Sequence, residues 1–400
     1  MISIDNKKDC CGCTACVSTC PKNAISLIED DQGFTYPHVN QSFCVNCGLC
    51  DKVCPVLNSE KRNKDYKKIY ALRLKDESIL QKSSSGGAFY AIASYVIQNL
   101  NGIVFGVKYD EKMEVRHAYT ETLEGLKDFQ GSKYVQSNIK GVYDQVRSFL
   151  CAGRYVLFTG TPCQVIALKL FLKKDYEKLI CVDNICHSVP SPRIFKEYLE
   201  MVNSAYKCNV VKIDMRNKKK GWSHAFYYYY YYYSDGTSLG DDKLKFEHWG
   251  KLFFSGLITR PSCNSCRFTS YRRTGDITVA DFWDDSLKRP EAYSPKGTSL
   301  FIVSTDKGEN VLNKIEETVN KWELTEDEAC QPCLKAPVKA NPRKEEFWKY
   351  YHKNGFRKAY NKYFKTKFKT KIRRTLTRIL KNTFIYQVLK RIKGKIKNGL

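Results

Sequence analysis

Apolar and polar positions along the middle of the chain follow two different periods. Short apolar runs, such as IYALRL at 69–74 and YVLFTG at 155–160, alternate with segments whose apolar residues recur every three or four positions, such as AFYAIASYVIQNL at 88–100. Short apolar runs are typical of buried strands, and a period near 3.6 is typical of amphipathic helices. Strands that alternate with helices predict an α/β domain whose sheet is largely parallel and covered on both faces.

The pattern extends through most of the chain and becomes richer in strands after residue 208. Residues 227–233 are seven consecutive tyrosines, and because tyrosine favours strands we expect a β-strand with rings on both faces. A platform on which a cofactor stacks is the alternative. Further strands are predicted at 102–110, 115–120, 179–186, 276–283 and 299–305, and further helices at 139–150, from 161, at 191–202 and at 307–319.

Two cysteine runs near the start of the chain depart from this pattern. Each has the spacing Cys-x2-Cys-x2-Cys-x3-Cys-Pro. In two-cluster bacterial ferredoxins with this spacing, three cysteines of a run hold one 4Fe-4S cluster and the fourth serves the other cluster. The predicted ligands are Cys10, Cys13, Cys16 and Cys54 for the first cluster, and Cys44, Cys47, Cys50 and Cys20 for the second.

The runs therefore predict a small dicluster ferredoxin-like domain at residues 1–60, with the two clusters as its core. A zinc site or a disulfide framework is the alternative, but zinc usually takes its ligands in two pairs. The segment 24–40 between the runs alternates around Asp31-Gln32-Gly33 and predicts a hairpin. Cys11 lies beside the first run and fits no ligand position.

Length, cysteine content and charge narrow the class of protein. A chain of 400 residues predicts two or three domains. Its 18 cysteines occur without an N-terminal apolar leader or an apolar run of membrane-spanning length, so we expect grouped, metal-binding cysteines in a reducing cytoplasmic compartment. The net charge is +25, and 20 Lys/Arg against 2 Glu after residue 340 place +18 of it in the last 60 residues.

The basic segment 341–400 predicts a helical tail outside the α/β core. Between Ile372 and Ile396, apolar residues recur every three or four positions among lysines and arginines. A basic amphipathic helix of this kind can lie on an anionic membrane surface. A solvated helix, or one that docks on a partner protein, is an equal alternative, and nucleic acid is a less favoured partner.

A second group of cysteines lies in the middle of the chain. Cys163 follows Gly160-Thr161-Pro162, Cys186 precedes His187, and Cys263 pairs with Cys266. These four thiolates are the number that a third 4Fe-4S cluster needs. The alternative is a zinc site made by Cys263, Cys266, Cys330 and Cys333. His187 is either a ligand or proton donor, or an ordinary packed histidine.

Six short motifs then carry a resemblance to a known family. They are SSSGGAF, QGSKYVQS, VLFTGTPCQV, VDNICHSVPSP, RPSCNSC and RRTGDITVADFWD, in this order. Together they resemble the coenzyme F420 hydrogenase and dehydrogenase beta subunits over residues 68–310. The expected organisation is a beta-subunit N-terminal α/β region at 68–150 and a C-terminal region with the further cysteines at 151–335.

The resemblance implies an iron–sulfur flavoprotein that binds FAD and exchanges electrons with a ferredoxin or another oxidoreductase subunit. It implies that Ser85, Gly86 and Gly87 lie at the flavin or its phosphates, although an ordinary helix start is the alternative. It favours the third cluster over zinc. It also implies that Gly160 and Thr161 belong to cofactor-binding motifs that bear a cluster, and that Lys133 and Tyr134 line the flavin or substrate pocket. Lys133, Tyr134 and His187 are the candidate catalytic residues.

Two departures from the family pattern affect the substrate. Cys186-His187-Ser188 replaces a common CHG, and residues 280–284 read ADFWD in place of GDFWG. They predict a reshaped substrate pocket and weaken the case for the deazaflavin coenzyme. Members that accompany surface-polysaccharide genes suggest a sugar-linked or carbonyl substrate. The hypothesis is an iron–sulfur flavin-dependent oxidoreductase, and the alternative is an electron-transfer subunit without a substrate site, docked on a partner enzyme or membrane.

Overall fold

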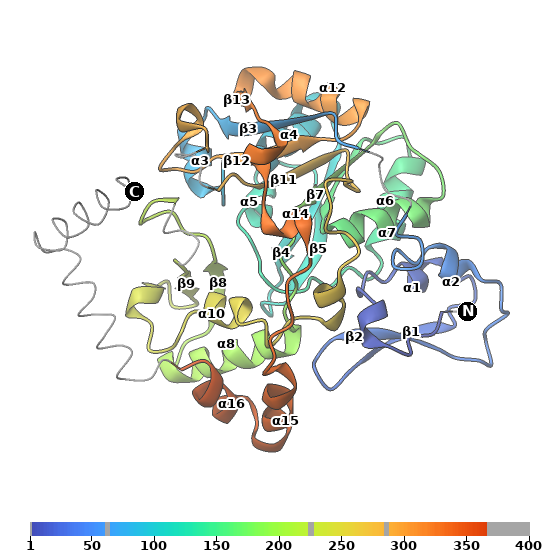
Figure 1. The fold of residues 1–400 in the computed structure, drawn as a ribbon, viewed down its shortest axis with the longest axis vertical. Coiled ribbons are helices and arrows are strands. Elements are labelled where there is room, and N and C mark those ends of the chain that lie inside the picture. The colour runs from blue at the N-terminus through green and yellow to red at the C-terminus, as the bar shows by residue number, and fades with distance from the viewer. Residues whose placement is uncertain (1, 61–64, 223–227, 284–287, 366–400) are drawn as a thin grey trace, which may run out of the picture.

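The computed structural model describes residues 2–60, 65–222, 228–283 and 288–365. A large sheet carries helices on both faces, a smaller sheet lies beneath it, and the cysteine-rich module sits at one side (Figure 1). The mixed α/β class predicted from the sequence is confirmed. In the described ranges, none of the helices combines the length and apolar character that crossing a membrane requires.

The large sheet has eight strands in the order β13-β3-β12-β11-β7-β6-β4-β5. The pairs β4–β6, β6–β7 and β7–β11 are parallel, whereas the pairs at both margins are antiparallel. The prediction of a largely parallel sheet is therefore wrong outside the centre. One reason is that β5 follows β4 after a short turn, which only an antiparallel pair can use. The strands are β3 (Lys68–Leu74), β4 (Ile103–Tyr109), β5 (Val115–Thr120), β6 (Val156–Gly160), β7 (Leu179–Asn184), β11 (Ile277–Asp281), β12 (Ser299–Val303) and β13 (Val319–Glu323).

Helices cover the two faces of this sheet in separate cores. Val104 of β4 packs in one core with α4 and α12, and its neighbours Ile103 and Phe105 pack in the other with α6 and α7, because successive strand residues point to opposite faces. Pro162 begins α7, as predicted. The helices of this part are α3 (Glu77–Lys82), α4 (Ala88–Leu100), α5 (Leu126–Phe129), α6 (Val142–Cys151), α7 (Pro162–Leu172), α12 (Asp306–Ile315), α13 (Glu326–Ala329) and α14 (Pro332–Lys335).

The smaller sheet has the antiparallel order β10-β9-β8. Its middle strand is part of the tyrosine run, in which Tyr231 and Tyr233 are buried and Tyr230 and Tyr232 are partly exposed. The predicted strand with rings on both faces is thus confirmed for these four residues, and Tyr227 lies outside the described residues. The elements are α8 (Pro192–Tyr206), β8 (Val210–Asp214), β9 (Tyr230–Tyr233), β10 (Ser238–Gly240) and α10 (Trp249–Phe254).

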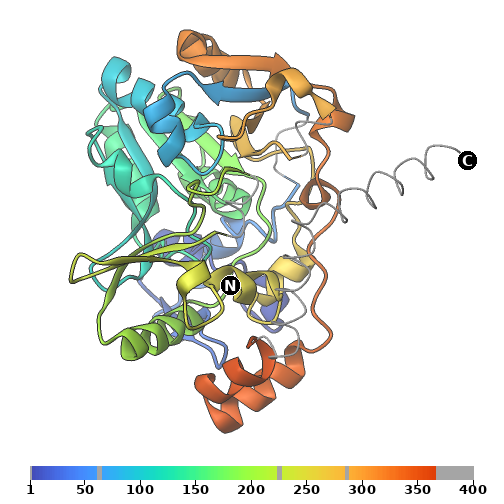
Figure 2. The same ribbon diagram turned by 90° about the vertical axis from the view of Figure 1, so that its left-hand side faces the viewer.

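Two helices of the predicted tail, α15 (Lys344–Asn354) and α16 (Phe356–Tyr363), pack beneath the smaller sheet (Figure 2). Phe347 and Tyr360 are buried in the same core as α8 and α10. The Trp348 indole donates to the carbonyl of Leu257 at 3.1 Å. These contacts make residues 344–363 part of the folded core. The amphipathic pattern predicted between residues 372 and 396 lies outside the described residues.

The N-terminal module contains the predicted hairpin, with β1 (Ile25–Glu29) antiparallel to β2 (Thr35–Val39). Gly33 in its turn has φ +79°, and a Cβ there would lie 2.3 Å from the Cβ of Arg193. Arg193, in the first turn of α8, donates to the carbonyls of Asp31 and Asp30 at 2.8 and 2.6 Å. The module is therefore held against the core. Its other elements are η1 (Lys7–Asp9), α1 (Ala15–Thr19) and α2 (Leu49–Lys52).

A buried ion pair links β7 to the loop before β11. Asp183 accepts from the Arg273 guanidinium at 3.0 Å and from the Thr274 hydroxyl at 2.7 Å, and both charged side chains are buried. Burial alone would raise the pKa of Asp183, but the Arg273 charge and the hydrogen bonds outweigh it and hold this pKa below its ordinary value. The carboxylate is therefore ionised in the folded protein.

We expect Asp183→Asn to lower the free energy of unfolding by about 3–5 kcal/mol, because it leaves the Arg273 guanidinium buried without its counter-charge. Asp144→Asn is the control, since Asp144 pairs with Arg147 on the surface of α6 and such pairs contribute about 1 kcal/mol or less. Urea unfolding followed by circular dichroism measures both variants. Equal, small losses in the two would contradict a supporting role for the buried pair.

Candidate functional site

The first predicted cluster set surrounds one cavity in the N-terminal module. Two cysteines of the loop before α1, one cysteine of α1 itself and one cysteine after α2 line this cavity. The Thr14 hydroxyl lines it as well, is buried, and has no hydrogen-bond partner in the described part of the chain. A cluster sulfur is an acceptor for such a hydroxyl, so the lining fits an iron–sulfur cluster. The four cysteines are Cys10, Cys13, Cys16 and Cys54.

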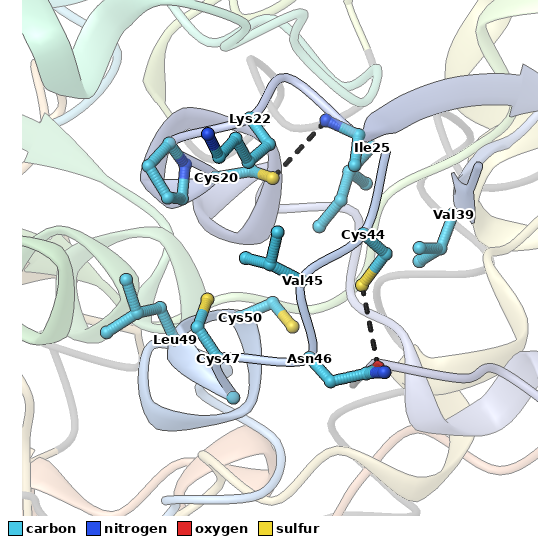
Figure 3. Close-up of a pocket in the computed structure, with 13 residues that line it drawn as sticks. Cys20, Lys22, Ile25, Val39, Cys44, Val45, Asn46, Cys47, Leu49 and Cys50 are labelled. Atoms are coloured by element: carbon cyan, nitrogen blue, oxygen red, sulfur yellow. Dashed lines mark hydrogen bonds between the residues drawn. The ribbon is translucent and has the colours of Figure 1, made fainter. Parts of the chain in front are cut away.

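The second predicted set surrounds a separate cavity on the outer side of the module. Figure 3 shows Cys20, Cys44, Cys47 and Cys50 around this space. The backbone amide of Ala24 donates to the Cys20 sulfur at 3.3 Å. Cys47 is exposed, whereas three cysteines of the first set are buried. The second set therefore has one of its cysteines, Cys47, at the protein surface.

The third predicted set also surrounds one cavity, which lies between the module and the core. Cys163 comes from the first turn of α7, Cys186 follows β7, and Cys263 and Cys266 lie on and after η3 (Pro261–Ser265). Burial raises the pKa of Cys263 to about 12, so without a bound metal this thiol is neutral. Segments from distant parts of the sequence thus bring together four thiols, the number that one 4Fe-4S cluster needs.

The competing zinc set is divided by the fold. Cys263, Cys266 and Cys333 line the third cavity, but Cys330 does not. Cys330 instead hydrogen-bonds with the Tyr271 hydroxyl and the Lys335 ammonium. Within the ranges that the structure describes, no three His, Cys, Asp or Glu side chains are grouped so that they could hold a single metal ion.

Cys11 lies between the first and third cavities and lines both. Its buried thiol hydrogen-bonds with the thiol of Cys163. Its carbonyl accepts from the Gln136 amide at 3.3 Å. The sequence showed only that Cys11 fits no ligand position in its run, because the partner thiol is 152 positions away. The structure makes Cys11 the contact between two cysteine sets.

Four further segments meet on the other side of the core. The Ser132 hydroxyl donates to Ser84 at 3.1 Å, which joins the QGSKY loop to the SSSGG loop. Lys218, after β8, donates to the carbonyl of Ser85 at 2.7 Å. Arg216 forms an ion pair with Asp281 at 2.8 Å and its guanidinium lies 5.3 Å from the centre of the Trp283 ring. The buried Arg216 and Lys218 side chains give this region a basic character.

The predicted catalytic residues differ in their surroundings. The Tyr134 hydroxyl accepts from Arg216 at 3.0 Å, and its ring stacks on Phe253 at 4.7 Å. The His187 ring lies 5.2 Å from the same Phe253 ring, and burial lowers the pKa of His187. Lys133 instead donates to two carbonyls of its own loop, and burial lowers its pKa to about 7. Tyr134 and His187 are thus joined through Phe253, whereas Lys133 is anchored locally.

The predicted cofactor-binding glycines have clear packing roles. The Gly86 amide donates to the Ser299 hydroxyl at 2.9 Å, and a Cβ there would lie 2.2 Å from the Leu72 carbonyl oxygen. Gly87 caps α4 with φ +84°. The Ser85 hydroxyl donates to the Thr298 carbonyl at 2.9 Å. The loop is therefore held against β3 and β12, and the Gly86 amide is already occupied.

Gly160 and Thr161, also predicted beside a cofactor, lie where β6 passes into α7. Thr161 forms a capping box with Gln164. Its hydroxyl lies 3.1 Å from the Cys163 sulfur. Thr161 lines the third cavity and Gly160 is not part of that lining. The contact with Cys163 places Thr161 beside the third cysteine set.

Arg216 and Lys218 were missed by sequence reasoning. They belong to DMRNKKKGW, where lysines and arginines look like a solvated loop. Both side chains are buried, at 3% and 5% exposure. Only tertiary contacts with Asp281 and with the carbonyls of Leu80 and Ser85 distinguish them from their exposed neighbours. No local signal marks them.

Family comparisons agree with this arrangement of a dicluster module and a cysteine-bearing α/β core. Residues 153–328 match the model for the C terminus of the coenzyme F420 hydrogenase/dehydrogenase beta subunit. Residues 9–58 match the 4Fe-4S dicluster domain. The resemblance predicted from the motifs is therefore confirmed by the match over residues 153–328, and the predicted dicluster domain by the match over residues 9–58.

Individual relatives come from methanogens. The chain is 27% identical over 261 residues to coenzyme F420 hydrogenase subunit beta of Methanococcus voltae, which covers 63% of this chain and 82% of that protein. It is 23% identical over 339 residues to the coenzyme F420-dependent sulfite reductase of Methanocaldococcus jannaschii, covering 79% of this chain and 47% of that protein. A chain of the F420-reducing [NiFe] hydrogenase complex from Methanosarcina barkeri is 16% identical with a TM-score of 0.44, over 75% of this chain and 93% of that one.

We expect Gly12→Ala to disturb the docking of the module. Gly12 has φ +71°, and a Cβ there would lie 2.4 Å from the Gln136 amide nitrogen and 2.8 Å from the Arg260 guanidinium. Gly48→Ala is a matched control, because Gly48 has φ +68° and open space around the added Cβ. Both variants carry backbone strain of about 1–2 kcal/mol, and overpacking adds about 1–3 kcal/mol to Gly12→Ala alone. Thermal unfolding compares the two variants. Equal melting temperatures would refute the close packing of Gly12 against Gln136 and Arg260.

We expect Lys218 to make folding stability depend on pH. Burial lowers its pKa to about 7 in the folded protein, against about 10.4 for an unfolded lysine. Between these values the unfolded state binds more protons, so stability rises with pH through this window. The rise in the free energy of unfolding from pH 6.5 to 8.5 should be about 2 kcal/mol larger in the wild type than in Lys218→Met. Urea titrations at both pH values measure it, and parallel changes in the two proteins would count against the lowered pKa.

Proposed function

We propose that this protein is an iron–sulfur flavin-dependent oxidoreductase that passes electrons between ferredoxin-type 4Fe-4S clusters and an organic substrate or deazaflavin coenzyme at a bound FAD. The observation that carries the proposal is the grouping of every predicted cysteine ligand around three cavities. The first two lie within the docked module, and the first and third share Cys11. Clusters in the second, first and third cavities, in that order, would form a continuous relay.

The chain's own residues fit the tasks of such a relay. Each 4Fe-4S cluster carries single electrons, at a potential set by burial, charge and hydrogen bonds to sulfur. Buried Cys13, Cys16 and Cys54 exclude water from the first set, whereas Cys47 leaves the second set open to an external partner. The Cys11–Cys163 contact spans the boundary between module and core. The second set is therefore the end at which a partner exchanges electrons.

The second part of the proposed function is a bound flavin. FAD, when bound, converts single electrons into hydride transfer. Its support is the basic region of Arg216 and Lys218 beside the SSSGG loop, which suits an anionic cofactor. A series of contacts joins that region to the third cavity, because His187 follows Cys186 and shares Phe253 with Tyr134. Lys133 donates to the carbonyls of Asp128 and Gln130 and not to groups of the basic region, so we assign it a structural role.

A second candidate is an electron-transfer subunit without its own substrate site. It is favoured by the likeness to a hydrogenase beta subunit, since that relative is one subunit of a larger enzyme. Another oxidoreductase subunit would then dock at the module. A ferredoxin as partner, a peripheral membrane location and a link to surface polysaccharide biosynthesis stay predictions from the sequence.

The metal and flavin content of protein purified without oxygen distinguishes the two candidates. About 12 iron atoms and one flavin per chain are expected for the enzyme, and about 8 iron atoms without flavin for the carrier. Cys163→Ser and Cys186→Ser should each remove about 4 iron atoms and leave the dicluster spectrum intact. Cys151→Ser, at an exposed cysteine of α6, is the control and should change nothing. A full iron content in the Cys163 and Cys186 variants would contradict the third cluster.

A further inference from the structure

Arg260 of the core reaches into the module at the first cysteine set. It is 0% exposed and lies three residues before Cys263. Its Nε donates to the Cys10 carbonyl at 2.8 Å and its Nη1 to the Gln136 side-chain oxygen at 3.0 Å. Its Nη2 donates to the Thr35 carbonyl at 3.0 Å and to the Cys10 sulfur at 3.5 Å. One guanidinium therefore touches both the backbone and the sulfur of a predicted cluster ligand.

The charge on Arg260 has no carboxylate partner among the described residues. Its hydrogen-bond acceptors are two carbonyls, an amide oxygen and a sulfur, and its faces meet the rings of Phe34 and Tyr36 at 5.3 and 4.4 Å. The other buried arginines of the core differ, since Arg216 and Arg273 each pair with an aspartate. A buried charge is costly unless an opposite charge compensates it. The thiolate of Cys10, with the anionic cluster that it would hold, is the compensating charge in reach.

We infer that Arg260 raises the reduction potential of the first cluster. Without this arginine, the burial of the cluster would give it a lower potential. The inference rests on the proposed function, because it requires the two N-terminal clusters. Reduction adds one negative charge to the cluster, and burial disfavours that added charge. A fixed guanidinium and its hydrogen bond to a ligand sulfur favour it.

The position of Arg260 favours electron transfer from the second cluster to the first. Arg260 contacts the first set and none of the residues that line the second cavity. An external one-electron carrier of ferredoxin type would reduce the exposed second cluster. That cluster would then be oxidised as the first is reduced, by transfer of one electron and no proton. Arg260 makes this inward step more favourable, which a merely structural arginine would not do.

Reductive titration of the full chain, purified without oxygen, tests the inference. The variants are Arg260→Gln and Arg260→Met, which are neutral, and Arg260→Lys, which keeps the charge. Arg193→Gln is the control, because Arg193 also donates to backbone carbonyls of the module, at Asp30 and Asp31, but lines none of the three cysteine cavities. Electron paramagnetic resonance follows each cluster during titration with dithionite and mediators. Cys47→Ser, which alters only the second set, and Cys186→Ser, which alters only the third, assign the signals.

In Arg260→Gln and Arg260→Met we expect the equilibrium constant for reducing the first cluster to fall at least tenfold, which is 59 mV for a one-electron couple. The second cluster should keep its potential. Arg260→Lys should show a smaller fall and Arg193→Gln none. An unchanged first potential, an equal shift of both clusters, or loss of the first cluster from both neutral variants would overturn the inference while leaving the proposed function standing. A wild-type chain without cluster signals would instead refute the proposed function.

Discussion

The structure depends on polar side chains of the core that end on backbone carbonyls of the N-terminal module. Arg260 and Gln136 reach the loop of the first cysteine run, and Arg193 reaches the hairpin turn. Because these hydrogen bonds end on the backbone of the module, they hold the loops themselves in position on the core. Gly12 and Gly33 permit the close approach, since a Cβ at either would collide with the core. The relative positions of the cysteine cavities follow from this docking.

Because the module is docked on the core, its two cysteine sets and the third set form one series. The second cysteine set includes the exposed Cys47, three cysteines of the first set are buried, and the third set lies where the module meets the core. Cys11 joins the first and third sets through Cys163. Beyond the third set, aromatic contacts lead from His187 through Phe253 to Tyr134 and the basic region at Arg216. The Cys11–Cys163, His187–Phe253, Phe253–Tyr134 and Tyr134–Arg216 contacts are at van der Waals or hydrogen-bond distance, which suits the exclusion of water.

Features with a local cause could be predicted from the sequence. The hairpin turn at Gly33 and the helix that begins at Pro162 follow from one residue's backbone preference. The spacing of the ferredoxin runs predicts the two cysteine groups that line the first and second cavities. Features with a tertiary cause could not. The antiparallel margins of the sheet depend on which strands meet, and the burial of Arg216 and Lys218 depends on partners far along the chain. The Gly86 amide was expected at a phosphate, but Ser299 occupies it, because glycine is needed there for close packing.

The central claim is that three iron–sulfur clusters lie in series at the three cysteine cavities. Anomalous diffraction at the iron absorption edge, from crystals grown without oxygen, tests it most directly. The account predicts three four-iron peaks, one in each cavity, with the first between Cys10 and Cys54 and the third beside Cys163 and Cys263. Two peaks confined to the module, or a single zinc atom in place of the third cluster, would contradict it.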